Sequence, residues 1–446
     1  MSETTRRMLV RGIAAAKAGD HSEARHYLER ILYLDASRDQ QVDAHWWLFT
    51  VSDDVAEQRD HLEEILACDP THAEAQRELA ILDGRLSRDE IIDPDHLPKP
   101  EAPDTQSSEA RRFVCPQCGG RMAFDPGSQR LRCKYCGHRE TILSAMKEGL
   151  AVEEKDFVVT MATVKGHVVP QGIQTLHCQG CQAELMCSDK LTARCPYCGS
   201  SHVVETVSQA QIPIEGLIPF TVEEPVANRR LANWLQQSLR GRPSRVARVR
   251  GLYLPLWTFD LMGEVKWRAV EGSNRVGGLS LGGGQDSMLL QGGRRVHEGV
   301  HSFLIDDTRI PASHLLPHRL NEAYRSFEFD GVVPYDAAYL SDQPAARYDV
   351  VVSDASLIAR RQVLETARQK ARIQAEVSMG DVRHFQVTPA NLTVQSYKLI
   401  LVPFWLGNYR MDDEIYTVLV NGQTGKVVGE KPPGRLRQFL GQWLGA

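Results

Sequence analysis

Four C-x-x-C pairs constrain this 446-residue chain more than any other feature of its sequence. Residues 115–136 read C-P-Q-C-G-G … C-K-Y-C-G-H, and residues 178–198 repeat the arrangement. Two residues between cysteines allow one tight turn to present both thiolates to one ion, and four thiolates suit tetrahedral Zn²⁺. The sequence therefore predicts two zinc ions, one held by Cys115, Cys118, Cys133 and Cys136, the other by Cys178, Cys181, Cys195 and Cys198.

Both centres are predicted to be structural, because four protein ligands leave no open position for water. Gly119, Gly137 and Gly199 each follow the second cysteine of a pair and supply the open backbone that such a turn needs. Redox chemistry is the alternative, but two paired motifs at this spacing argue against it. Cys68 and Cys187 are surplus, and we interpret Cys187 as a strand residue. Ten cysteines are too few for a disulfide scaffold at this length, which favours a reducing, cytoplasmic setting.

The two cysteine segments resemble zinc ribbons, the small three-stranded metal modules also found in transcription factor IIB. Ribbons bind nucleic acid in some proteins and brace neighbouring domains in others. The resemblance therefore implies the module and leaves its partner open.

Residues 5–88 have the apolar spacing of helices, and the pattern recurs after 34 residues, at 28–32 and again at 62–66. This period is that of tetratricopeptide repeats. We expect two degenerate repeats and a capping helix over 72–86, with an ordinary helical bundle as the alternative because three repeats are the usual minimum. Stacked helical pairs offer a concave surface, so a protein partner is expected here.

The chain is predicted to be a multidomain α+β protein, since its length suits two to four domains. Residues 89–112 contain four prolines and many acids and read as a linker. The predicted order is helical-repeat hairpins (1–88), linker (89–112), first ribbon (113–140), connector (141–172), second ribbon (173–206), an α+β domain with a mainly antiparallel sheet (207–430) and an amphipathic tail (431–446).

Within 207–430 the pattern predicts helices over 225–240 and 350–377 and strands around 252–268, 348–353, 383–388 and 395–420. Two runs, Y-L-P-L-W-T-F-D at 253–260 and L-V-P-F-W-L-G-N at 401–408, resemble each other. They are expected to be equivalent strands of one sheet, with their tryptophans in the core.

The order of the motifs resembles a bacterial family. The ribbons are followed by I-P-F (218–220), the run at 253–260, Y-L (339–340), A-R-Y-D-V (346–350), V-P-F-W-L-G-N-Y-R (402–410) and N-G-Q-T-G-K-V-V-G-E (421–430). Over roughly 113–430 this is similar to tandem zinc-ribbon proteins often labelled replication-restart helicase (primosomal protein N′)-like. Many members continue into membrane helices, whereas this chain ends at residue 446.

The residues do not support the helicase label. An ATP-driven helicase needs a P-loop, G-x-x-x-x-G-K-[ST], to hold phosphates. The nearest candidate, residues 422–426 (G-Q-T-G-K), lacks the spacing and is followed by valine. We therefore expect no ATPase activity.

A zinc peptidase is a second catalytic hypothesis, because residues 297–301 read H-E-G-V-H. On a helix, His297 and His301 would bind zinc while Glu298 served as general base, with Glu322 as a third ligand. Gly299 within the motif and the strand-like residues after it argue against a ligand-bearing helix.

Charge is informative only locally, because the net charge is −5. Residues 225–259 hold no acid but seven arginines: Arg229, Arg230, Arg240, Arg242, Arg245, Arg248 and Arg250. This patch suits a phosphate backbone, or else a solvated surface. Residues 435–444 place apolar side chains on one helical face opposite two arginines, which suits a membrane surface, a partner groove or the protein's own core.

The sequence thus favours a non-catalytic zinc-binding adaptor in the cytoplasm, with helical repeats for protein contacts. A nucleic-acid-binding protein that uses the ribbons and the arginine patch is the alternative, and the zinc peptidase is the third hypothesis.

Overall fold

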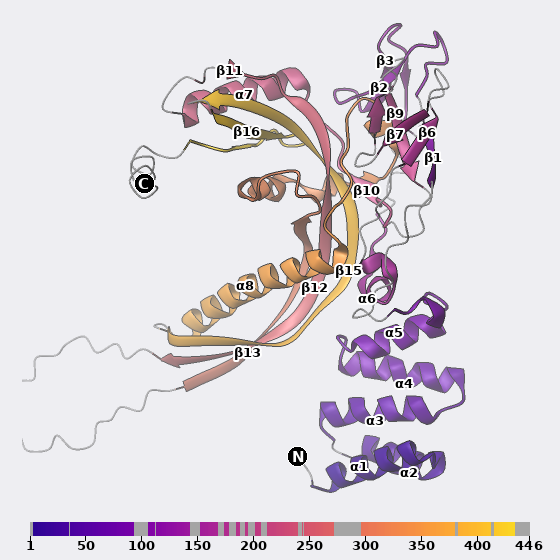
Figure 1. Cartoon of the computed structure of the whole chain (residues 1–446). Coiled ribbons are helices and arrows are strands. Elements are labelled where there is room, and N and C mark those ends of the chain that lie inside the picture. Colours follow the sequence, from indigo (N-terminus) through magenta and orange to yellow (C-terminus); the bar gives the residue numbers. More distant parts are fainter. Residues whose placement is uncertain are drawn as a thin grey trace, which may run out of the picture.

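The structure is a computed structural model of the chain, and Figure 1 shows its arrangement. It describes residues 3–34, 36–92, 106–111, 113–142, 152–167, 174–177, 184–187, 192–194, 201–206, 212–239, 243, 245–271, 296–379, 382–411 and 414–432. Helices at the N-terminus are followed by small cysteine-containing sheets and then by a large, mostly antiparallel α+β domain. This agrees with the predicted multidomain α+β class.

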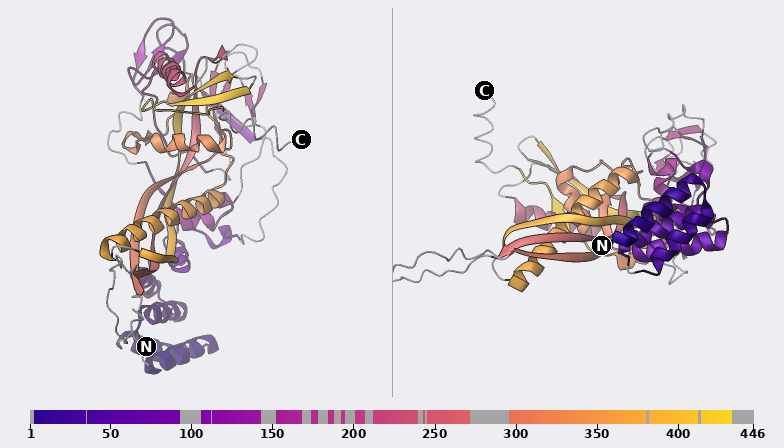
Figure 2. Two further views of the ribbon diagram at one scale, coloured as in Figure 1. Left: turned by 90° about the vertical axis from the view of Figure 1, so that its left-hand side faces the viewer. Right: turned by 90° about the horizontal axis from the view of Figure 1, so that it is seen from below.

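The N-terminal helices, here the helical region, pack mainly against their neighbours in sequence and stack at one end of the molecule (Figure 2). The apolar pair Leu28 and Ile31, and the pair 34 residues later, Leu62 and Ile65, are fully buried. The predicted 34-residue spacing therefore marks equivalent inward-facing positions, while the tetratricopeptide classification itself stays a prediction. The helices are α1 (Glu3–Ala18), α2 (His21–Leu32), α3 (Arg38–Val51), α4 (Val55–Cys68) and α5 (Ala73–Leu82), followed by the short η1 (Arg88–Glu90).

The α+β domain is built on one long, curved sheet in which β15 is the central strand (Figure 1). The main path runs β13–β12–β15–β10–β14, with β5, β11 and β16 also paired to β15 and β17 paired to β16. The strands are β5 (Lys155–Asp156), β10 (Gly216–Leu217), β11 (Arg245–Val246), β12 (Arg250–Glu271), β13 (Val296–Pro311), β14 (Val333–Pro334), β15 (Val382–Met411), β16 (Glu414–Asn421) and β17 (Val427–Gly429).

The two proline–tryptophan runs belong to one sheet, as predicted, and they pair directly, with Tyr253 opposite Pro403 and Pro255 opposite Leu401. Both indoles are buried and donate to backbone carbonyls, Trp257 to Val350 at 2.9 Å and Trp405 to Val222 at 2.8 Å. The two tryptophans therefore have structural roles.

Helices cover the sheet at different levels. Helix α8 (Val352–Met379) packs on the strands through small residues that recur every four positions, from Ala355 to Ala375, and shares a core with Trp257. Helix α7 (Glu224–Ser238) packs near the other end and shares a core with Trp405. The remaining short helices are α6 (Phe157–Met161), η3 (Val164–Gly166), η4 (His318–Ser326), η5 (Phe329–Gly331) and η6 (Ala337–Leu340).

Three sequence-based expectations differ from the structure. Residues 348–353 form no strand, because the Val350 carbonyl accepts from Trp257 and α8 starts at Val352. The strands predicted at 383–388 and 395–420 are instead one long strand, β15, followed by β16. The last part of the predicted linker forms β1, at Gln106–Arg111, which pairs with β6 and β9.

Two small sheets belong to the cysteine segments. The first has the order β2–β3–β4, as expected for a three-stranded module. The second has the order β7–β6–β1–β9–β8. Their strands are β2 (Met122–Asp125), β3 (Arg130–Cys133), β4 (Arg139–Glu140), β6 (Gln174–His177), β7 (Glu184–Cys187), β8 (Thr192–Arg194) and β9 (Ser201–Thr206).

Candidate metal centre

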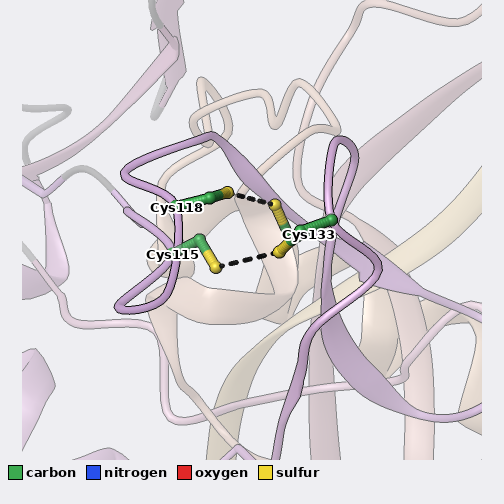
Figure 3. Close-up of side chains that lie close together, drawn as sticks. Cys115, Cys118 and Cys133 are labelled. Atoms are coloured by element: carbon green, nitrogen blue, oxygen red, sulfur yellow. Dashed lines mark hydrogen bonds between the residues drawn. The ribbon is translucent and has the colours of Figure 1, made fainter.

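The first set of cysteines converges on one point, from the loop before β2 and from the end of β3 (Figure 3). The Sγ atoms of Cys115 and Cys136 are 3.6 Å apart, and those of Cys118 and Cys133 are 3.5 Å apart. None of the four forms a disulfide. Sulfurs bound at ~2.3 Å to a tetrahedral zinc ion would be about 3.8 Å apart, so these four side chains fit one Zn²⁺ with little movement.

Each C-x-x-C pair is held by a tight turn. The N–H of Gly119 donates to the Cys115 carbonyl at 2.9 Å, and the N–H of Gly137 donates to the Cys133 carbonyl at 3.2 Å. Both glycines have positive φ, +69° and +76°, which side chains with a Cβ rarely adopt. The glycines predicted to open these turns therefore do so.

The local backbone also favours a thiolate. The N–H groups of Cys136 and then of Tyr135 lower the pKa of Cys133 to about 6. A thiolate is the form that ligates zinc. Cys136 is shifted the other way: the N–H of His138 lowers its pKa, but the neighbouring cysteine sulfurs raise it to about 12. Four protein ligands would leave no open position on a bound zinc ion.

The module around this centre, residues 113–142, is packed against the α+β domain. Cys115 and Cys133 are buried in the same apolar cluster as Phe220 and Tyr339. The rings of Phe124 and Tyr339 are 5.0 Å apart, and the Phe124 N–H donates to Ser341 Oγ at 2.9 Å. The metal-binding loops and the large domain therefore share one core.

Polar contacts reinforce this interface. Asp342 forms ion pairs with both Arg121 and Lys134 of the module. Gln129 donates to the Phe220 carbonyl at 2.8 Å. Sequence reasoning did not assign Ser341 and Asp342 a role, although they directly follow the Y-L pair that was part of the family resemblance.

The second set, Cys178, Cys181, Cys195 and Cys198, lies outside the described residues. The strands around it are described, and Cys187 ends β7 opposite Gln174. This agrees with the interpretation of Cys187 as a strand residue. The second zinc ion stays a prediction.

The zinc-peptidase hypothesis is wrong in its geometry, because residues 297–301 form a strand and not a helix. His297 and His301 lie on strand β13, opposite Ala269 and Val265, so they are ~13 Å apart along the strand. Glu298 points to the other face and lies 3.3 Å from Arg268. His301 contacts Gln374 at 3.1 Å, and Glu322 belongs to η4. A strand cannot bring these two imidazoles to one ion.

The P-loop-like stretch is a turn between strands. The Gly425 N–H donates to the Asn421 carbonyl at 2.8 Å, and Gly425 has a φ of +73°. Residues 421–426 thus connect β16 to β17 in a tight turn rather than opening a phosphate-binding helix.

The arginine patch is only partly described. Arg229 and Arg230 on α7, and Arg248 and Arg250 before and at the start of β12, are exposed. The Val249 N–H donates to Asn228 Oδ1 at 3.1 Å, which places these two segments together. Arg240, Arg242, the side chain of Arg245 and the tail at 435–444 lie outside the described part. No described helix combines the length and apolar character of a membrane span.

Comparison with known proteins links the chain to uncharacterized sequences. A domain of unknown function, DUF8243, matches residues 119–198, which contain Cys133 and Cys136 of the first set and all four cysteines of the second. The uncharacterized protein YdjG of Bacillus subtilis (strain 168) is 27% identical over 333 residues, which cover 72% of this chain and 90% of YdjG. No solved structure matches. Neither of these two similarities names a primosomal protein, a repeat class or an activity.

Proposed function

We propose that this protein is a non-catalytic, zinc-binding scaffold. The first zinc centre braces the α+β domain, a second ion occupies the cysteines at 178–198, and the helical region binds a protein partner. The observation that carries the proposal is the shared core of the first cysteine module and the α+β domain, in which Cys115 and Cys133 are buried beside Phe220.

A ribbon that reads nucleic acid needs a free surface, and one face of this module is instead packed on its own chain. Its Phe124 packs on Tyr339, and its Arg121 and Lys134 are paired with Asp342. The one carboxylate of Asp342 therefore offsets part of the positive charge of these two side chains, which are held against their own chain. This favours bracing over nucleic-acid binding for the first module.

The helical region supports the adaptor part of the proposal because it is built separately. Among the described residues, the two apolar clusters around Leu28 and Leu62 contain only side chains of the helical region. It meets the rest of the described chain at the β5–α6 segment, through the Arg85–Asp156 ion pair at 2.9 Å and the Ile92 N–H to Ala162 carbonyl bond at 2.9 Å. Arg38 and residues 69–71 also line a cavity together with β12 and β13. Much of its surface is left for a partner.

Zinc stoichiometry tests the proposal most directly. Elemental analysis of purified, untagged protein is expected to give two zinc ions per chain, and chelation is expected to increase proteolysis of the α+β domain as well as of the cysteine segments. A metal-free chain with an unchanged digestion pattern would refute the bracing role. An additional ion lost in His297→Ala would revive the peptidase hypothesis.

A nucleic-acid-binding function is the second candidate, because exposed arginines from α7 and from residues 248–250 lie together. If they follow a phosphate backbone, affinity for DNA or RNA should fall steeply with salt. For each phosphate contacted, a tenfold rise in salt should lower the affinity about tenfold. Replacing Arg242, Arg245 and Arg248 with glutamine should flatten that dependence. Binding that is absent even at low salt would exclude this candidate.

A further inference from the structure

Two histidines on neighbouring helices of the helical region face each other at close range. His45 on α3 and His61 on α4 have Nδ1 atoms 3.2 Å apart and ring centroids 5.3 Å apart. Both rings are partly buried, and the His61 side chain is 16% exposed. Neither residue belongs to the cysteine centres, and the proposed scaffold function makes no use of them.

The separation suits a shared metal ion. Two imidazole nitrogens bound at ~2.0–2.1 Å to one tetrahedral ion would be about 3.3 Å apart. The first cysteine set shows the same relation, because its sulfurs stand slightly closer together than the bound distance. The rings are thus placed as the donors of a metal site are placed.

A carboxylate behind His61 selects the required tautomer. The Nε2 atom of His61 is buried, has no hydrogen-bond partner among the described residues, and lies 3.9 Å from Glu57 Oε1. Glu57 is ionised, because hydrogen bonds from Arg25 and then from Ser52 lower its pKa to about 2. A proton on Nε2 faces this carboxylate across 3.9 Å, which is too far for a hydrogen bond but favourable in charge, and it leaves the Nδ1 lone pair directed at His45.

Burial keeps both rings in the neutral form that binds metal. Desolvation is the largest influence on each, and it lowers the pKa of His45 and of His61 below the usual value. The charge of Glu64 acts on His45 in the opposite direction and raises its pKa. Glu64 is exposed and follows His61 by three residues, which puts both on one face of α4.

We propose that His45, His61 and Glu64 bind one late first-row divalent ion, such as Zn²⁺ or Ni²⁺, between α3 and α4. Glu64 reaches the ion by rotation of its side chain, and water completes the shell. Imidazole and carboxylate donors suit this class of ion. The ion would hold the two helices together and bind less tightly than the ions at four-thiolate sites.

The test uses the untagged full chain with its cysteine sites loaded with zinc. Isothermal titration with Zn²⁺ and Ni²⁺ is expected to show one additional site, lost in His45→Gln and in His61→Gln. Glu64→Gln should weaken it by roughly tenfold or more, since even outer-shell changes cost that much. His26→Gln, at an exposed histidine of α2, is the matched control and should bind as the wild type does.

Each outcome decides the matter independently of the cysteine centres. If wild-type protein takes up no ion beyond the cysteine-bound zinc, the two rings form only a hydrogen bond and the proposal is wrong, whether or not the variants fold. If the extra site survives in both histidine variants, it lies elsewhere. If every variant keeps its cysteine-bound zinc, the result at the histidine site does not affect the scaffold proposal.

Discussion

The first cysteine module and the helical region are attached to the α+β domain in opposite ways. The module places Cys115, Met122 and Phe124 in the apolar cluster of the large domain. The helical region keeps Leu28, Leu62 and their neighbours in clusters of its own. The cysteine module therefore shares the core of the large domain, whereas the helical region has separate cores.

Size explains part of this difference. A module of about 30 residues buries too little apolar surface to be stable alone and depends on a metal and a neighbour. Five helices, each packed on the next, can bury a core without help. A structural ion next to a shared core is suited to bracing, and a separately built helical stack is suited to presenting a surface.

The largest expected effect comes from Cys133→Ser. A structural zinc site ties metal binding to folding, with apparent binding free energies on the order of 10 kcal/mol. We expect zinc loss at the first centre and increased protease cleavage in both the module and the α+β domain. Cys195→Ser should do the same to the second centre.

Cys68→Ser is the matched control for these variants. Cys68 ends α4, away from the first cysteine set, and its thiol donates to Gln41 Oε1 at 3.9 Å. Its zinc content should equal that of the wild type. If Cys133→Ser kept its zinc and its protease resistance, the module would not be a zinc-dependent brace.

A core substitution in the helical region tests the other half of the comparison. Leu62 is fully buried beside Ile65 and Ala75, so Leu62→Ala should cost about 2–4 kcal/mol of stability. Amide hydrogen exchange should accelerate in α3 to α5 and stay unchanged in the long sheet. Leu357→Ala on α8, where the leucine is exposed, should change little. Faster exchange throughout the chain would mean that the two parts unfold as one unit.

The interface between the module and the domain gives a smaller effect. Asp342 is 23% exposed and pairs with Arg121 and Lys134, so Asp342→Asn should cost about 1–2 kcal/mol. Thermal unfolding of the zinc-loaded chain measures this. Glu298→Gln breaks the exposed pair with Arg268 and serves as the control, with a change near zero. If Asp342→Asn and Glu298→Gln changed stability equally, the ion pairs of Asp342 would not contribute to the interface.

The sequence was a good guide where the chemistry is local. A C-x-x-C pair carries its own turn, so Gly119 and Gly137 could be placed in tight turns before any fold was known. The 34-residue spacing likewise identified the buried positions Leu28 and Leu62, because helical periodicity repeats with the helices.

The sequence was a poor guide where contacts between distant segments determine the local structure. Strand β15 continues through Pro389 because its pairing with β12 shifts register there: Glu264 pairs with Asn391, but Val265 pairs with Pro389. Prolines are tolerated in a strand at such irregularities. The H-E-x-x-H string is a strand because Gly299 lies under Trp267, where a Cβ would be 2.5 Å from the ring. The local sequence reveals neither β12 as the partner of Pro389 nor Trp267 as the neighbour of Gly299. The ion pairs of Asp342 and the contact between His45 and His61 are non-local in the same way.

The smallest expected effect concerns the junction between the helical region and the domain. Arg85 is 48% exposed and Asp156 36%, so their ion pair contributes about 0.2–1 kcal/mol and weakens with salt. Arg85→Ala should leave the stability of both parts almost unchanged while hydrogen exchange rises at α6. Arg88→Ala removes a pair with Glu78 inside the helical region and is the control, because it does not cross the junction. Asp156 is unsuitable for substitution, since its carboxylate also caps α6 by accepting from the N–H groups of Val158 and Val159. A loss well above 1 kcal/mol in Arg85→Ala, spread over both parts, would show that the helical region is built into the domain as firmly as the cysteine module is.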